Sequence, residues 1–291
     1  MIEQCRRYLL KGYTWAAIAV LAGTGFISTY FSYNEKMMLM EQMDSGADDL
    51  NREVLRDIIS EYDNGLTYLL RFLTNGDLYY FYVTAAVIFA GLFMSSEMLR
   101  EKDNNYGNFC VARQGYGNLL RNSCGGMILC ISIVVMISTV LIFTGDMIFA
   151  GYRHCIFSFG RYQISFGQGI LIALGSVIFL MIFLALMMII SVSVSMFIKN
   201  LILARLFPVL AFILIPVVMG STLANVFPAT GQFFCRFIPL EYLGTVTDLL
   251  YYSSENQKIS VICAGAAISM LTVIAVSAAY LNKKRFSRDY I

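Results

Sequence analysis

Few side chains in this sequence could catalyse a reaction or bind a metal. The single histidine, His154, stands beside Cys155, but two ligands do not make a metal site, and one histidine excludes the paired-histidine zinc motif. Phosphate-binding loops of the types GxxxxGK[ST] and GxGxxG are absent from the sequence. Three serines at 191–195 would need a partner base to act as nucleophiles, and none is visible. The residues therefore predict a chain that is not an enzyme and that binds no metal or cofactor of its own.

The composition is that of a membrane protein. Of 291 residues, 58% are hydrophobic and only 14% are charged, whereas a soluble domain is about half apolar and roughly a quarter charged. A helix needs about 20 apolar residues to cross a bilayer, and continuous apolar runs favour helices over barrel strands. We expect an all-α polytopic membrane protein with one transmembrane domain over 1–291 and six transmembrane helices, or spans. These spans are predicted at 14–31, 79–96, 124–144, 166–198, 201–224 and 259–281.

The distribution of basic residues predicts the orientation. If the N-terminus is in the cytoplasm, the four cytoplasmic loops and termini together hold 13 Lys and Arg residues and five acidic residues. The segments on the other face hold 8 basic and 14 acidic residues. Cytoplasmic loops of membrane proteins carry the excess of Lys and Arg. We therefore expect cytoplasmic termini in a multi-pass protein of the cell (cytoplasmic) membrane. The lipid bilayer is then an expected partner, and binding to nucleic acid is not expected.

Amphipathic helices are expected outside the spans. Residues 1–13 place basic residues among apolar ones, as a helix lying in an anionic cytoplasmic interface would. The extracellular loop 33–78 has apolar residues at helical spacing over 48–63 and again over 66–73, which predicts two helices. The pair would either lie on the outer membrane surface or form a lid over a transport path, and amphipathicity does not choose between the two.

The loop before the last span is rich in aromatic residues but is broken by proline and glycine. Such breaks argue against a spanning helix, and a free loop in water would not expose so many rings. A re-entrant helical hairpin on the outer side satisfies both constraints. Its characteristic residues are Pro228, Pro239 and Tyr242, with the tyrosine near the lipid headgroups.

The connection between the second and third spans is longer than a turn requires. It occupies 97–123, whereas helix connections typically take about 2–8 residues. No span carries a charge near its middle, so the buried acids of ion-driven transporters are not visible. Work on the chain would then come from a partner, for which 97–123 is the expected contact. The other interpretation is a solvated loop whose arginines only fix the topology.

This combination of elements resembles the type-2 ABC transporter permeases. In that family the cytoplasmic segment after the second span holds an acid, a Gly-Thr pair, apolar residues and then basic residues. Here Asn108 stands where threonine is usual. By resemblance, two permeases form a pathway, and each docks a coupling helix into a separate ATPase subunit. The resemblance implies that the residues contacting the ATPase are Asp103, Tyr106, Gly107, Asn108, Phe109, Val111 and Arg113.

The resemblance also implies the function. The chain would be the membrane permease subunit of an ATP-driven ABC exporter, with ATP and Mg bound by the partner ATPase and a second permease chain completing a homodimer or heterodimer. Apolar spans favour a hydrophobic or amphipathic cargo, such as an antimicrobial peptide, a drug or a lipid-like molecule. Two other functions stay open, namely a non-transporting membrane sensor or immunity protein and an ion-coupled carrier.

Overall fold

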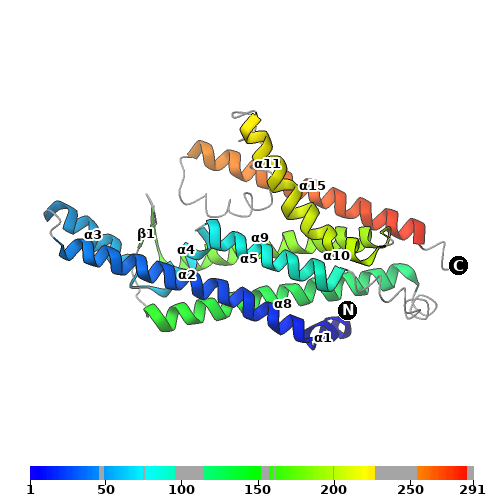
Figure 1. Ribbon diagram of the computed structural model, residues 1–291, viewed down its shortest axis with the longest axis horizontal. Coiled ribbons are helices and arrows are strands. Elements are labelled where there is room, and N and C mark those ends of the chain that lie inside the picture. The colour runs from blue at the N-terminus through cyan, green and yellow to red at the C-terminus, as the bar shows by residue number, and fades with distance from the viewer. Residues whose placement is uncertain are drawn as a thin grey trace.

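Long helices make up almost all of the structure, a computed structural model (Figure 1) that describes residues 1–45, 49–74, 76–95, 115–151, 157–159, 162–198, 200–226 and 254–286. The first half comprises α1 (Ile2–Leu9), α2 (Gly12–Asp44), α3 (Asp49–Glu61), α4 (Gly65–Thr74), α5 (Gly76–Phe89), the π-helix η1 (Ala90–Ser95) and α8 (Tyr116–Ala150). The second half comprises the hairpin of β1 (Phe157–Phe159) and β2 (Tyr162–Ile164), then α9 (Phe166–Ser195), α10 (Leu201–Val209), the π-helix η2 (Leu210–Leu214), α11 (Ile215–Val226) and α15 (Ser254–Phe286).

Five helical segments of the described chain are long and apolar enough to cross a membrane. They are α2, α8, α9, the continuous α10–η2–α11 segment and α15. The chain is therefore a multi-pass helical membrane protein. The predicted span at 79–96 corresponds to α5 and η1, whose apolar stretch Leu78–Leu92 is shorter. A count of six spans stays a prediction that depends on this segment.

The bundle has two distinguishable ends (Figure 1). At one end, here called the α1 end, α1 packs on the first turns of α8, and the Tyr116 hydroxyl donates a hydrogen bond to Asn282 in the last turns of α15. The other end carries α3, α4 and the β-hairpin and is called the α3 end. The first helix and the last helical turns thus lie on the same side of the bundle. Their assignment to the cytoplasm stays a prediction from charge.

Small residues permit a close contact between α2 and α8. A Cβ atom added at Gly25 would overlap the side chain of Ile142, and one added at Gly145 would overlap the ring of Phe26. The two glycines therefore receive a large side chain from the opposite helix. Because lipid is as apolar as the side chains, membrane helices associate through such close packing.

Helix α4 is buried inside the α3 end of the bundle. Leu66 and Leu70 have no exposed surface, and Tyr68 is almost completely buried. The helix packs against α2, α5, α8 and α9. In α3, by contrast, Val54 is exposed. Both predicted helices exist, but α4 is part of the core and does not lie on the membrane surface. The lid over a transport path stays a prediction.

Candidate functional site

The predicted coupling and hairpin residues lie outside the described part of the chain. The connection predicted at 97–123 is too long at its end, because residues 116–123 belong to α8. The remaining residues 97–114 are called the coupling segment, which lies between η1, ending at Ser95, and α8, beginning at Tyr116. The predicted residues outside the described part are Asp103, Tyr106, Gly107, Asn108, Phe109, Val111, Arg113, Pro228, Pro239 and Tyr242.

The chain enters the coupling segment through a π-helix. π-Helical turns are rare and often occur at functional sites. η1 packs on α10, where Gly91 leaves room for Pro208, since a Cβ atom at this glycine would lie only 2.9 Å from the proline Cβ. Pro208 lies inside α10, and only Val209 separates it from η2. Because proline lacks the backbone N–H that donates a helical hydrogen bond, the helix is irregular at Pro208. The contact between η1 and α10 therefore joins two irregular stretches of helix.

The chain leaves the segment at a fixed anchor on α8. Gly115 has a φ of +76°, a conformation that favours glycine, and α8 begins at the next residue. The buried Tyr116 hydroxyl then donates to Asn282 Oδ1 at 2.5 Å, and Asn282 Nδ2 donates to the Ser193 carbonyl at 2.8 Å. These two hydrogen bonds join α8, α15 and α9, and we call Tyr116, Asn282 and Ser193 the three-helix clamp. The sequence showed no periodic signal for it, because its members are far apart in the chain.

The N-terminal helix lies across the same end. Cys5 and Tyr8 face inward, while Ile2 and Leu10 are 78% and 73% exposed. Gly126 of α8 permits the close approach, because a Cβ atom there would lie 2.7 Å from the Cβ of Gln4. The helix of 1–13 predicted from sequence is thus present as α1, followed at Gly12 by α2. Its exposed apolar residues suit an interfacial position.

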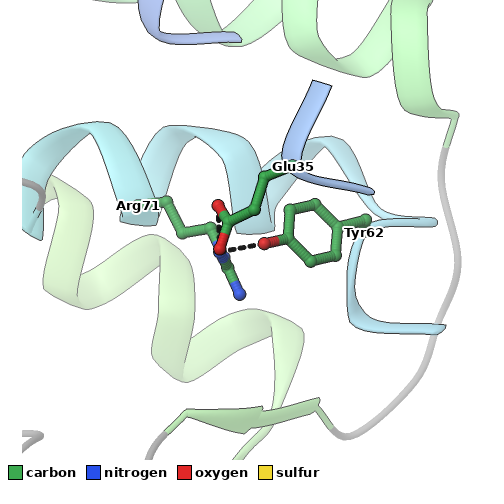
Figure 2. A network of polar contacts seen from close by, with 3 residues as sticks. All are labelled: Glu35, Tyr62 and Arg71. Carbon is green, nitrogen blue, oxygen red and sulfur yellow. Dashed lines mark hydrogen bonds and ion pairs between the residues drawn. The ribbon is translucent and has the colours of Figure 1, made fainter. Parts of the chain in front are cut away.

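At the α3 end, ion pairs join α2 to the α3–α4 hairpin (Figure 2). Arg71 of α4 lies 3.1 Å from the Glu35 carboxylate of α2 and donates to the Tyr62 hydroxyl. Lys36 donates to Asp63 at 2.7 Å. Two consecutive residues of α2 therefore hold the hairpin through opposite charges, Glu35 to a cation and Lys36 to an anion.

A buried acid that sequence reasoning missed lies beside this hairpin. Asp146 near the end of α8 has no exposed surface and accepts a hydrogen bond at 2.5 Å from Thr29 of α2. Its Oδ2 atom has no hydrogen-bond partner among the described residues. The sequence placed Asp146 in the outer loop because it follows the predicted span 124–144 by two residues. The only available signal was a polar Thr-Gly-Asp stretch continuing a helical run.

An apolar cavity of about 150 Å³ lies under α4, between α8 and α9. Leu69, Phe143 and Leu174 are among the side chains that line it. Pockets for drug-sized ligands are typically about 300–1,000 Å³. This cavity therefore has room for a short alkyl group but not for the cargo expected from the sequence.

Comparison with known proteins assigns neither a family nor a function to the chain. No family model, curated protein or solved structure matches the chain. Within the described ranges, no group of three His, Cys, Asp or Glu residues could hold a metal ion. A function for the chain must therefore be inferred from the geometry at the two ends of the bundle.

The two tyrosines of the α3–α4 hairpin give a pH prediction. Burial raises the pKa of Tyr62, with Arg71 opposing the shift, and burial, followed by the charge of Asp63, raises the pKa of Tyr68 to about 12 from an ordinary value of 10.0. Because the folded state favours the neutral phenols, their contribution to stability is complete below pH 10. The contribution of Tyr68 is lost as the pH rises through about 12, and that of Tyr62 is also lost in the alkaline range above pH 10. Spectrophotometric titration in detergent should show that these phenols ionise late.

The Tyr62→Phe and Tyr68→Phe variants are the controls for this titration, because each should remove one late-ionising phenol. If the difference titration gave the Tyr62 and Tyr68 phenols an ordinary tyrosine pKa, the burial of these two side chains in the hairpin would be contradicted.

Proposed function

We propose that the chain is the membrane permease subunit of an ATP-driven ABC exporter and that residues 97–114, the part of the predicted segment 97–123 that precedes α8, are its contact with a separate ATPase subunit. The observation that supports this most is how the segment is held. It begins at a π-helix and ends at a helix joined to α9 and α15 by the three-helix clamp. A load on the segment would therefore reach two different parts of the bundle.

The mechanism proposed is mechanical. ATP and Mg bind the ATPase subunits and draw them together, and Tyr106 and Phe109 anchor the segment in a groove of that partner, since buried aromatic residues tend to dominate such contacts. The movement bends the chain at η1 and displaces the start of α8. Because the clamp links α8 to α9 and α15, the helices respond together and change access to a path between two permeases.

A second permease chain, identical or different, fits the uneven burial of the spans. In α10–α11 and α15, only 17% and 22% of the most apolar stretch is buried within a single chain, against 56% in α9. Residues such as Val218 and Val273 are therefore available to another chain or to lipid. The cargo path proposed here runs between the two chains.

Co-purification from membranes in mild detergent tests the proposal. The expected result is an ATPase chain with a phosphate-binding loop, retained by the wild-type protein and lost when the coupling segment is replaced by a Gly-Ser linker of equal length. Recovery of the replaced chain in the same folded yield serves as the control. A preparation that never contains an ATPase, together with transport that continues without ATP, would exclude the assignment.

An ion-coupled carrier is the second candidate, and the buried Asp146 is the observation that favours it. Intramembrane acids often carry protons in such carriers. Asparagine at this position keeps the oxygen that accepts from Thr29 but cannot take up and release a proton. For the proposed exporter, we expect Asp146→Asn to leave ATP-driven transport in reconstituted vesicles unchanged. Loss of transport in this variant, together with collapse of wild-type transport when the proton gradient is removed, would favour the carrier.

A further inference from the structure

A second cavity opens at the α1 end, between the first turns of α8 and the last turns of α15. Its volume of about 540 Å³ is within the range of ligand sites, roughly 300–1,000 Å³. It is lined by both charged and apolar side chains, unlike the cavity under α4. Its size and lining therefore suit an amphipathic ligand.

The walls of this cavity are held in place by buried contacts. Tyr116 and Asn282, which form part of the three-helix clamp, stand next to lining residues on α8 and α15. The rings of Tyr116 and Phe286 also contact each other, with centroids 6.2 Å apart. A site whose two walls are joined in this way is already formed before a ligand binds, which lowers the cost of binding.

Two cations line the cavity from opposite walls. Arg121 comes from α8 and Lys283 from α15. The stem of Lys283 lies against α8, because a Cβ atom at Gly117 would be 3.2 Å from the lysine Cε. Neither cation pairs with an acid among the described residues. Two like charges on one cavity repel each other, so an anion between them would be stabilised by both.

The remaining lining indicates what the anion belongs to. Leu120 is buried, and Tyr280, also in the lining, is 63% exposed on the outside of α15. At the same end of the bundle, Trp15 is exposed, and tryptophan is enriched where lipid headgroups begin. The cavity therefore presents cations beside apolar surface at the level of the membrane interface.

We propose that this cavity binds the phosphate of an anionic phospholipid in the cytoplasm-facing leaflet. Arg121 offers a planar pair of donors and Lys283 a compact charge, and both are suited to phosphate oxygens. The acyl chains extend along the apolar surface next to Tyr280. A zwitterionic lipid has the same phosphate but adds a cation, which Arg121 and Lys283 disfavour. The site does not depend on the transport function proposed above.

Native mass spectrometry of the full-length protein in detergent tests this site. The protein is titrated with phosphatidylglycerol or with phosphatidylcholine of the same acyl chains. We expect the wild type to retain phosphatidylglycerol in preference, and the double variant Arg121→Gln/Lys283→Gln to bind it at least about tenfold more weakly, since each basic residue near an anionic surface contributes about fivefold. Lys284→Gln, which removes the adjacent charge outside the lining, is the matched control and should bind like the wild type.

Several results would overturn the proposal. Equal retention of the two lipids, or an equal loss in Lys284→Gln, would mean that only general surface charge is involved. Full displacement of phosphatidylglycerol by inorganic phosphate at equal concentration would identify the ligand as a free phosphate. Loss of a co-purifying protein from the double variant, with lipid binding unchanged, would assign the cavity to that protein.

Discussion

Replacing Phe109 with aspartate is expected to abolish both ATP-driven transport and the stimulation of the partner ATPase. An aromatic anchor in a protein groove commonly contributes about 2–4 kcal/mol, and a buried unpaired charge in its place adds a further cost. At about 1.4 kcal/mol for each factor of ten, affinity for the ATPase should fall at least about thirtyfold. The measurement is ATPase activity and transport in vesicles that contain both subunits.

Two matched variants make this test specific. Phe109→Tyr keeps the ring and should retain activity, whereas Gly107→Pro restricts the backbone of the same segment and should abolish it. All three variants should insert into the membrane in wild-type amounts, because the change lies outside the apolar spans. Unchanged stimulation and transport in Phe109→Asp would exclude coupling through this residue.

Replacing Gly65 with alanine is expected to destabilise the α3 end of the bundle by about 3 kcal/mol, the upper range for overpacking. The added Cβ atom would lie 2.7 Å from the backbone carbonyl of Asp146 and from Cα of Met147. Backbone atoms cannot rotate away as a side chain can, so α4 or the end of α8 must move. This movement would also stretch the 3.1 Å hydrogen bond from the Gly65 amide to the Gly151 carbonyl.

Thermal unfolding in detergent measures this effect, and Gly23→Ala is its control. Gly23 lies within α2 and has nothing within 4 Å of an added Cβ atom, so alanine there should be neutral or stabilise the helix by up to about 1 kcal/mol. Equal shifts in the unfolding temperature of the two variants would contradict the close packing of α4 on α8.

The positions of the spans could be predicted from sequence because hydrocarbon thickness sets their length. The run predicted at 166–198 corresponds to α9, and that at 124–144 lies within α8. Helices were underestimated at their ends, since a helix that leaves the bilayer loses its apolar pattern but keeps its backbone hydrogen bonds.

The depth of α4 and the environment of Asp146 could not be predicted in the same way. An amphipathic pattern shows that a helix has an apolar face, but it does not show whether lipid or other helices cover that face. The contact between Thr29 and Asp146 joins residues 117 positions apart, and no local periodicity encodes it. Because the coupling residues lie outside the described part of the chain, their assignment stays a prediction.

The length of α2 makes the α3 end a direct marker of sidedness. Its 33 residues extend about 50 Å at 1.5 Å per residue, whereas the hydrocarbon core is about 30 Å thick. An upright α2 that begins at one hydrocarbon boundary would therefore extend about 20 Å past the other boundary, at the end where α3 follows it. A membrane-impermeant maleimide applied to intact cells should label a cysteine introduced at Val54, which is exposed on α3, and the reagent would then report which compartment this end faces.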